Sequence, residues 1–438
     1  MSFPLPSIAT AKQRELFNYG LVHKYSLLCA DPRLGKTAVA VWLRAARNVK
    51  CIAICPAYLT RSWVREISKW SPKDSVHLVT EGRKIPKQQT TDWIVISYDL
   101  ARKAEHLFTK EVQVICDEIH NLKAMATKRA EFMHRVIYEN SVAYLHGLTG
   151  TPIKNRVREF YSPLCLMYYS PHIRDRRFLK NYEDEIQFAE HFSIPHRKKI
   201  EVQTRWGKRK IEITDYRGIR NVPELKMWLQ NRYIRIRAEE GDLPPLTYVD
   251  YQVSDKADPE LLASFRAYFD RDTGPKADRE FRTSSTLPEH KAKAALQKVK
   301  VTAQIAENIL DEEGCVLIYS DHREPAAALA VHFGVPAITG EVSSGRRDAL
   351  VERFQLGLDN VLVSTIGALK EGATLSRAKS IVLNDPCWVP GDLTQVTNRI
   401  RAMGDKTPKA VHRVLGSPQD AAIWKTLEEK MKVIEAAT

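Results

Sequence analysis

The chain has 438 residues, of which 44% are hydrophobic and 27% are charged, and its formal net charge is +14 at pH 7. At about 100–200 residues per domain, this length predicts two to four domains, each able to bury a core of its own. No apolar run approaches the roughly 18 residues of a membrane span, and the N-terminus lacks the apolar region of a signal peptide. We therefore expect a cytoplasmic protein without a membrane partner, and its basic charge favours a polyanionic one.

The seven cysteines lie mostly within apolar, strand-like runs. This placement is typical of small buried hydrophobic residues in a reducing compartment, and it argues against disulfides. Cys51 and Cys55 are close in sequence, but no second pair accompanies them. We therefore expect no metal site built from cysteine.

Residues 1 to about 165 alternate short apolar runs with stretches of helical periodicity. Such alternation predicts a parallel β-sheet with helices on both faces, whose ligands bind at the carboxyl ends of the strands. Polar segments follow the apolar runs at the corresponding positions, which supports this architecture. The predicted strands are Leu27–Ala30, Cys51–Cys55, Trp93–Ser97, Val112–Cys116 and Ala143–Leu148.

The sequence CADPRLGKT, residues 29–37, is the first candidate site. The apolar run Tyr25–Ala30 predicts a buried strand, a short loop follows, and the residues after it have helical spacing. A strand, a tight loop and a helix start form a phosphate cradle, in which Lys36 reaches the outer phosphates and the Thr37 hydroxyl ligates magnesium. The full phosphate-loop pattern has glycine in place of Ala30, and Gly-Lys-Thr at a helix start is often only a cap. The remaining segments must decide between these interpretations.

Asp117 and Glu118 follow the fourth predicted strand, in the sequence DEIH. A phosphate site needs one carboxylate to hold magnesium, and hydrolysis needs a second one to orient and deprotonate water. We assign the first role to Asp117 and the second to Glu118. An Asp-Glu pair that only caps the next helix is the alternative, and the upstream phosphate loop makes it the weaker one.

The sequence LTGTPIKN, residues 148–155, follows the fifth predicted strand. Threonines at a strand end can hydrogen-bond the DEIH segment and respond to the nucleotide. They can equally form an ordinary turn, and the sequence leaves both interpretations open.

Residues from about 166 to 290 lose the strand–helix alternation and combine basic with aromatic residues. Phe178, Tyr182, Trp206 and Tyr233 are interleaved with arginine and lysine, which suits contacts to phosphates and bases. A charge run is usually only a solvated surface, but the interleaved aromatic residues favour nucleic-acid binding here. Residues 272–292 are polar, contain two prolines and lack periodicity, so we expect a linker.

The alternation returns from about residue 293, where an amphipathic helix (Lys293–Leu310) leads into a second α/β lobe without a phosphate loop. In this lobe the sequence QVTNRIR, from Gln395 to Arg401, starts a helix with arginines on or near one face. An arginine supplied across a cleft stabilises the charge of a transferring phosphoryl group. Surface helix arginines are usually only solvated, so this segment alone is a weak signal.

Together these segments resemble the motifs of superfamily 2 helicases and translocases, and within that superfamily the Swi/Snf-type ATPases. The resemblance runs from about Gln13 to about Leu415. Three segments are specific to the branch: LTGTPIKN, the S-W-x-x-E-x-x-K-W run of Ser62–Trp70, and DPCW followed by Gln395. The other matching segments are ADPRLGKT, WIVISYD and DEIH in the first lobe, and VLIYS, STIGALKEGATL and NDPCWVPGDLTQVTNRIRAMGD in the second.

The resemblance implies two RecA-like parallel-sheet lobes, residues 1–165 and 291–438, with a basic, mainly helical insertion and linker between them at residues 166–290. It implies that ATP and Mg²⁺ bind between the lobes and that duplex DNA lies across both. The implied catalytic residues are Lys36, Asp117, Glu118, Arg399 and Arg401, and the implied magnesium ligands are Thr37 and Asp117. The implied nucleotide-binding residues are Gln13, Asp31, Gly35, Lys36, Thr37, Gly372, Gln395 and Arg399. The expected nucleic-acid contacts are Ser97, Tyr98, Lys154, Asn155, Arg205, Trp206, Lys208, Arg209, Arg346, Thr365 and Trp388.

Three departures from the family pattern bear on these assignments. Motif I reads Asp-Pro-Arg-Leu where relatives usually have Glu-Met-Gly-Leu, and motif V carries one extra residue before Glu371-Gly372. Motif VI has Ala402 where relatives carry a second arginine, and Arg401 lies one residue early. Arg399 is therefore the first choice for the charge-stabilising arginine, with Arg401 as a candidate substitute. The compact chain resembles phage or bacterial members of the branch.

The main hypothesis is a monomeric, DNA-stimulated ATPase that walks along duplex DNA and displaces proteins or remodels DNA. A strand-separating DNA or RNA helicase is a second interpretation. A non-hydrolysing nucleic-acid-binding regulator is a third, but the intact Lys36, Thr37, Asp117 and Glu118 argue against it. No particular protein partner is indicated by the sequence.

Overall fold

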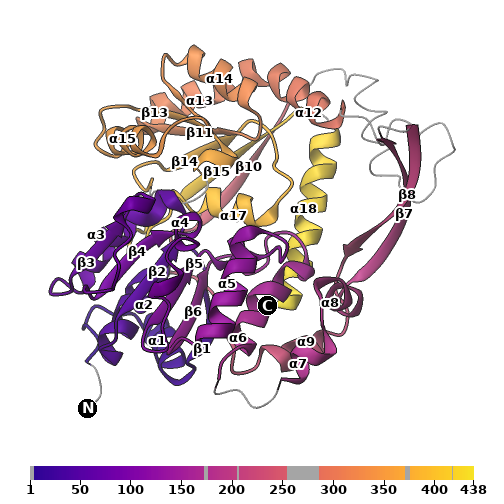
Figure 1. The fold of residues 1–438 in the computed structure, drawn as a ribbon. Helices are drawn as coiled ribbons and strands as arrows, with labels where there is room; N and C mark the ends of the chain where they lie inside the picture. Colours follow the sequence, from indigo (N-terminus) through magenta and orange to yellow (C-terminus); the bar gives the residue numbers. More distant parts are fainter. Residues whose placement is uncertain (1–3, 172–175, 205–206, 254–285, 370–374, 417) are drawn as a thin grey trace. The chain divides into compact units, whose positions relative to one another are not determined.

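The computed structural model describes residues 4–171, 176–204, 207–253, 286–369, 375–416 and 418–438. These residues form two compact units (Figure 1). The first unit comprises Met1–Ile194, Tyr216–Glu239 and Val433–Thr438. The second comprises Pro195–Asp215 and Glu240–Lys432.

The first unit is built on a seven-stranded sheet in the order β3-β4-β2-β5-β6-β1-β9, in which every pairing is parallel. Because all strands point the same way, the segments after β1, β5 and β6 meet at one edge of the sheet. The strands are β1 (Tyr25–Ala30), β2 (Cys51–Cys55), β3 (Val76–Val79), β4 (Trp93–Ser97), β5 (Gln113–Asp117), β6 (Tyr144–Thr149) and β9 (Tyr233–Ile236).

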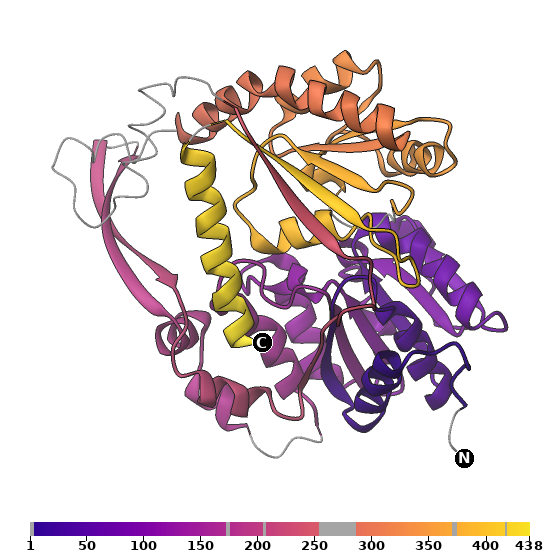
Figure 2. The same ribbon diagram turned by 180° about the vertical axis from the view of Figure 1, so that it is seen from behind.

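Helices cover both faces of this sheet (Figure 2). Residues along each strand alternate between two cores. Leu28 packs with α1, α2 and α3 on one face, whereas Leu27 packs with α5 and α6 on the other. The last residues of α18 join the second of these cores, where Ala437 is fully buried. The helices of this unit are α1 (Ala11–Val22), α2 (Lys36–Arg47), α3 (Thr60–Trp70), α4 (Tyr98–Ala101), α5 (Lys128–Asn140), α6 (Tyr161–Tyr168), α7 (Arg177–Asn181), α8 (Glu185–Phe192) and α9 (Val222–Leu229). Short 3₁₀ turns are η1 (Ala57–Leu59), η2 (Gly82–Lys84), η3 (Glu105–Leu107), η4 (Ile119–Leu122) and η5 (Val157–Phe160).

The second unit contains a six-stranded parallel sheet in the order β10-β15-β14-β11-β13-β12. Helices α13 and α14 cover one face, and α15, α16, α17 and α18 contribute to the core on the other. The strands are β10 (Leu246–Gln252), β11 (Val316–Ser320), β12 (Ala337–Ile338), β13 (Val361–Thr365), β14 (Ser380–Leu383) and β15 (Lys409–Leu415). The helices are α12 (Thr286–Gln297), α13 (Val299–Glu313), α14 (Arg323–His332), α15 (Ser344–Gln355), α16 (Ile366–Leu369), α17 (Pro390–Thr397) and α18 (Pro418–Ala437).

Two parallel-sheet α/β lobes were predicted, and the fold confirms this class. The expectation that the insertion is mainly helical missed the two-stranded sheet of β7 (Ile194–Thr204) and β8 (Gly207–Arg217). It also missed β9 and β10, which lie within residues 166–290 but join the sheets of the first and second units. The domain boundaries at residues 165 and 290 stay predictions. The predicted linker, residues 272–292, lies outside the described residues up to residue 285 and then begins α12.

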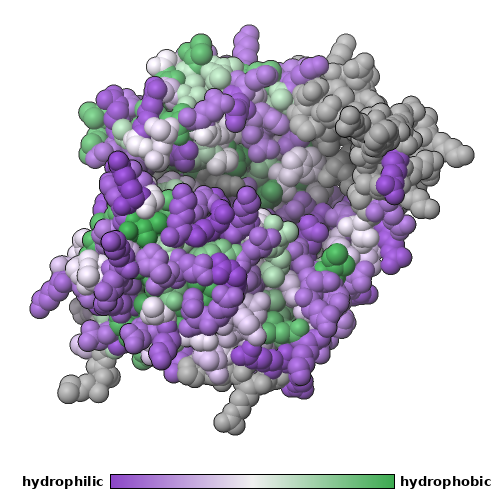
Figure 3. Space-filling view, viewed as in Figure 1, coloured by the Kyte–Doolittle hydropathy of each residue, from purple (hydrophilic) through white to green (hydrophobic). Residues whose placement is uncertain are grey.

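Hydrophilic side chains cover most of the face seen in Figure 3, and hydrophobic residues appear there in separate groups. Among the helices that the structure describes, none combines the length and the apolar composition needed to cross a bilayer.

Candidate active site

The phosphate-loop candidate connects the end of β1 to the first turn of α2. Gly35, the residue before α2, has a φ of +78°, in the left-handed region that glycine adopts without strain. A β-carbon at Gly35 would lie 2.1 Å from Nε2 of Gln13, so this neighbour also requires glycine. The ammonium of Lys36 donates to the carbonyls of Ala30 at 2.8 Å and Asp31 at 3.4 Å. The loop thus places Lys36 and the amino end of α2 together at the carboxyl edge of the sheet, where an anion is favoured.

Gln13 supports this loop from α1. Its side chain completes a capping box with Thr10: Oε1 accepts the Thr10 N–H at 3.0 Å, and the Thr10 hydroxyl accepts the Gln13 N–H at 3.2 Å. Its Nε2 donates to the carbonyl of Leu34 at 3.3 Å. Gln13 was predicted as a nucleotide contact, and its place beside Gly35 keeps that prediction open.

Asp117 ends β5, and its carboxylate is enclosed by donors. Oδ1 accepts the backbone N–H of Glu118 at 3.0 Å, and Oδ2 accepts the indole N–H of Trp63 at 2.8 Å. Burial and then the adjacent Glu118 charge raise the pKa of Asp117 to about 7, against the opposing effect of the Trp63 hydrogen bond. A nearby divalent cation would relieve this cost, because it favours the ionised carboxylate.

Glu118 adopts a left-handed backbone conformation, with φ of +50°, which costs a non-glycine residue roughly 1–3 kcal/mol. Its Oε2 accepts the hydroxyl of Thr149 at 3.2 Å and lies 3.2 Å from Nδ1 of His120. Burial alone would raise the pKa of Glu118, but the hydrogen bond to His120 and the charges of Lys36 and Lys154 hold it below its usual value. The strained residue is therefore an ionised carboxylate held in one orientation.

The Thr149–Thr151 turn after β6 provides that orientation. The Thr149 hydroxyl contacts Glu118 and lies 3.1 Å from Nδ1 of His120, and it accepts the backbone N–H of Thr151 at 3.0 Å. The structure combines the two interpretations left open by the sequence, because Thr149 forms the turn with Thr151 and also hydrogen-bonds the DEIH segment; a response to the nucleotide stays a prediction. The sheet order explains the contact, since β6 lies directly between β1 and β5.

Sequence reasoning missed two residues that support this site and gave a third a different role. Trp63, on α3, holds Asp117, and Arg235, at the end of β9, pairs with Asp31 of the phosphate loop and donates to the Gly150 carbonyl at 2.9 Å. Trp63 belongs to the S-W-x-x-E-x-x-K-W run, which carried the family resemblance but no assigned role. Tyr98 was expected to contact nucleic acid, but it is buried and its hydroxyl donates to the Asp117 carbonyl at 2.9 Å. Its ring therefore supports the end of β5.

The other expected nucleic-acid contacts differ in exposure. Arg209 and Arg346 are exposed, Asn155 and Trp388 are half-buried, and Ser97, Lys154 and Thr365 are buried. Arg205 and Trp206 lie outside the described residues, as does the side chain of Lys208. These assignments stay predictions.

The second unit holds the candidate residues of motifs V and VI. Gln395, on α17, and Arg399, just after it, are buried, and the Arg399 carbonyl accepts the Leu375 N–H at 2.9 Å. Arg401 donates through Nε to the Pro244 carbonyl at 2.8 Å and through Nη1 to Oδ1 of Asn398 at 3.1 Å. Those contacts fasten Arg401 to the segment before β10. Gly372 lies outside the described residues.

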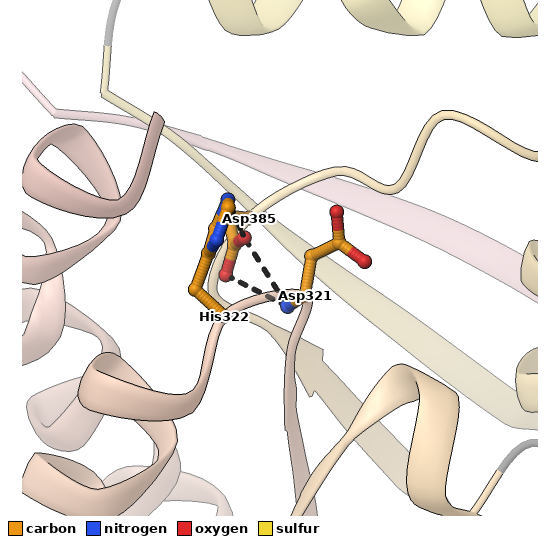
Figure 4. Close-up of side chains that lie close together, drawn as sticks. All are labelled: Asp321, His322 and Asp385. Atoms are coloured by element: carbon orange, nitrogen blue, oxygen red, sulfur yellow. Dashed lines mark hydrogen bonds and ion pairs between the residues drawn. The ribbon is translucent and has the colours of Figure 1, made fainter. Parts of the chain in front are cut away.

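Asp321, His322 and Asp385 lie together after β11 and β14, with one ligand-type atom of each within 4.8 Å of the others (Figure 4). Asp385 accepts the hydroxyl of Ser320 at 2.5 Å and the backbone N–H of Asp321 at 3.2 Å, and the carboxylate of Asp321 lies 3.2 Å from the ammonium of Lys291. Figure 4 shows that the contact to Asp385 comes from the Asp321 backbone and not from its carboxylate. Both carboxylates are thus engaged by neighbouring protein groups, and the three residues connect the ends of β11 and β14.

Two family models match the chain, the SNF2-related domain over residues 17–223 and the Helicase conserved C-terminal domain over residues 298–404. The chain is 25% identical to the "SWI/SNF-related matrix-associated actin-dependent regulator of chromatin subfamily A-like protein 1" of Xenopus tropicalis, over 97% of this chain and 44% of that protein. It is 23% identical to the "DNA annealing helicase and endonuclease ZRANB3" of Mus musculus, over 91% of this chain and 38% of that protein. The solved "Sulfolobus solfataricus SWI2/SNF2 ATPase core in complex with dsDNA" aligns over the full chain at a TM-score of 0.44 and 19% identity.

The chain spans less than half the length of these curated relatives. The two matching families follow each other in the order of the two units, and apart from Gln13 and Asp405 the motif residues expected of each lie within the matched ranges. The chain belongs to the Swi/Snf branch of superfamily 2 helicases and translocases.

Proposed function

We propose that this protein is an ATPase that is stimulated by duplex DNA and moves along it. The observation that carries the proposal is the grouping of Lys36, Asp117 and Glu118 at one edge of the first sheet, close enough for the Lys36 charge to lower the pKa of both carboxyl groups and for the Glu118 charge to raise that of Asp117. A lysine beside two carboxylates of unequal proton affinity is the set that phosphoryl transfer to water requires.

Within this site Lys36 and the amino end of α2 bind the phosphates of ATP. The Thr37 hydroxyl and Asp117 would hold Mg²⁺, which neutralises phosphate charge when bound with the nucleotide; both are oxygen donors, as Mg²⁺ prefers. Glu118 accepts a proton from the attacking water, and Thr149 and His120 keep its carboxylate in place. By their match to motif VI, Gln395 and Arg399 are assigned to the γ-phosphate.

Duplex DNA as the activating ligand is supported by three observations. The net charge of +14 favours a polyanion. Relatives in the Swi/Snf branch include a protein named as a DNA annealing helicase. A hollow of about 640 Å³, which we call the basic hollow, lies beyond the carboxyl end of β3 and is lined by Arg83, Lys87, Lys103 and His106, with Glu81 as its carboxylate.

The test is ATP turnover by the full chain, measured without nucleic acid and with duplex, single-stranded and branched DNA and RNA. We expect duplex DNA to stimulate turnover, and we expect Glu118→Gln to retain ATP binding but lose the stimulated rate. A triplex-displacement assay beside a strand-displacement assay separates movement along the duplex from strand separation. Equal turnover with and without every nucleic acid would refute the proposal.

A further inference from the structure

Arg235 lies at the end of β9, the edge strand next to β1. In the register of the sheet, Cys29 of β1 pairs with Arg235 on one side and with Thr149 of β6 on the other. Arg235 therefore occupies the same row as the turn that holds Glu118, one strand beyond the phosphate loop. Two strand spacings of about 4.8 Å separate Arg235 from Thr149, a span that the long arginine side chain covers.

The guanidinium joins two motifs at that edge. Nη2 forms an ion pair with Asp31 of the phosphate loop, and Nη1 donates to the Gly150 carbonyl at 2.9 Å. The side chains of Arg235 and Asp31 are only 17% and 27% exposed, so the pair is weakly screened by water. A β-carbon at Gly150 would lie 3.1 Å from the ring of Pro32, so the loop and the turn are also in direct contact.

Asp31 is tied to the same strand by its backbone and by its other oxygen. Its N–H donates to the Ile236 carbonyl at 2.9 Å, and its Oδ2 accepts the N–H of Ala238 at 2.9 Å. The first residue of the phosphate loop is thus held by three polar contacts, to Arg235, Ile236 and Ala238. This segment leads, through Glu239, into the chain of the second unit.

We propose that Arg235 is a positioning residue of the ATPase, which holds the phosphate loop against the Thr149–Thr151 turn through Asp31 and Gly150. The proposal rests on the proposed function and adds a residue to the same site. Arg235 acts through Asp31, because its two Nη groups are engaged by the protein. The planar guanidinium of arginine can donate to Asp31 and to the Gly150 carbonyl at the same time. The single ammonium of lysine keeps the charge but cannot reproduce this geometry.

The experiment compares Arg235→Gln, Arg235→Lys, Asp31→Asn and the double variant Asp31→Asn/Arg235→Gln in the full chain. We measure Kd for a fluorescent ATP analogue with Mg²⁺, and KM and kcat for ATP with saturating duplex DNA. Removal of a charged hydrogen bond should raise Kd and KM by about tenfold or more in Arg235→Gln and in Asp31→Asn. The double variant should be no weaker than the more severe single one, because both remove the same interaction, and lysine should recover part of the affinity.

Arg47→Gln is the matched control. Arg47 is another largely buried arginine of this unit; it donates to Gln113 at 2.8 Å, lies 2.7 Å from Nε2 of His146 and stacks on Tyr144, at the amino edge of the sheet. The Arg47→Gln variant should have a lower melting temperature than the wild type, with unchanged Kd and KM for the nucleotide. If Arg235→Gln behaves like Arg47→Gln, with additive effects in the double variant, Arg235 is only structural and the proposal is overturned.

The two proposals fail in different ways. A wild-type chain that binds the ATP analogue but shows no DNA-stimulated turnover refutes the proposed function, while the Kd series still decides the role of Arg235. A wild-type chain that turns over ATP, with unchanged Kd and KM in the Arg235 variants, refutes only the positioning role. A wild-type chain that binds no nucleotide refutes both.

Discussion

The indole N–H of Trp63 donates to Oδ2 of Asp117 at 2.8 Å, with the two side chains 2% and 8% exposed. Trp63 reaches this carboxylate from α3, whose other buried positions lie away from it: the Thr60 hydroxyl donates to the Ala57 carbonyl at 2.9 Å, and Ile67 packs in the core. The hydrogen bond favours the ionised form of a carboxyl group whose pKa is raised by burial and by Glu118. Trp63 is therefore placed to decide how readily Asp117 becomes available to a cation at neutral pH.

Trp63→Phe should weaken magnesium use by the enzyme. Without the indole N–H the pKa of Asp117 rises further, so the acid limb of the pH–rate profile should move to higher pH and the Mg²⁺ concentration for half-maximal rate should increase several-fold. Trp93→Phe is the control, because Trp93 is equally buried and donates at 2.8 Å to Asp74, outside the site. Both variants should lose about 1–3 kcal/mol of unfolding free energy. A pH profile that moves equally in the two variants would remove Trp63 from the site.

Asp117→Asn should stabilise the protein at alkaline pH while abolishing turnover. A carboxyl group whose folded pKa is raised contributes stability that is full below its unfolded pKa of about 3.9 and is lost as pH rises through the folded value. That loss falls between about pH 4 and the folded pKa of about 7. Asparagine carries no such penalty, so the melting temperature of Asp117→Asn relative to wild type should increase from pH 5 to pH 8.

Asp99→Asn is the comparison variant, because its effect on stability should depend on pH in the opposite direction. The hydrogen bond and charge of Arg129 lower the pKa of Asp99, so its stabilising contribution is present at neutral pH and lost as pH falls. Asp99→Asn should therefore destabilise at pH 8 and have no effect in acid. If Asp117→Asn followed the same pattern, the raised pKa of Asp117 would be wrong.

The sequence was sufficient to predict two parallel-sheet lobes and five strands of the first sheet, β1, β2, β4, β5 and β6. Buried parallel strands are unbroken apolar runs, as in Cys51–Cys55, and polar residues after such runs mark the binding edge. It was not sufficient for β9, because Tyr233–Ile236 carries the alternating polar pattern of an edge strand within a basic stretch. The role of Arg235 depends on that strand pairing with β1 from more than 200 residues away, and no local pattern reports such a contact.

One expected nucleic-acid contact, Tyr98, is buried in the structure for a related physical reason. Tyr98 follows a strand in the expected motif, but whether a strand-end aromatic faces solvent or the core depends on what packs over it. In this fold α5 and α6 contribute to the same core as Tyr98, and the ring is buried. Exposure is a tertiary property, so spacing alone placed a core residue at a binding surface.

Arg399→Ala should lower kcat strongly with little change in ATP affinity. A charge-stabilising arginine contributes about 10³–10⁵ in rate in related phosphoryl-transfer enzymes. Arg401→Ala should instead lower the melting temperature, because Arg401 fastens Pro244 and Asn398. Single-turnover rates and Kd for the ATP analogue, measured for both variants, decide which arginine acts. The larger kcat loss in Arg401→Ala would reverse the assignment.

Lys87→Glu/Lys103→Glu should weaken duplex binding through the basic hollow. Both lysines are exposed, and within the described part of the chain neither has a carboxylate partner, whereas the hollow's own Glu81 is paired with Arg83 at 2.7 Å and Lys84 at 3.2 Å. Each lysine–phosphate contact that is lost should reduce the magnitude of the slope of log K against log salt by about 0.9. We therefore expect a several-fold lower affinity at moderate salt and a slope smaller by about 1–2.

The control for this double variant is Lys24→Glu/Lys110→Glu, which changes the same number of charges. These two exposed lysines precede β1 and β5, at the amino edge of the same sheet. Net charge acts over long distances and would weaken binding equally in both variants, whereas direct phosphate contacts change the salt slope only where DNA lies. Equal slopes and equal affinities in the two double variants would show that the duplex does not contact the hollow, because only a local contact can distinguish one edge of the sheet from the other.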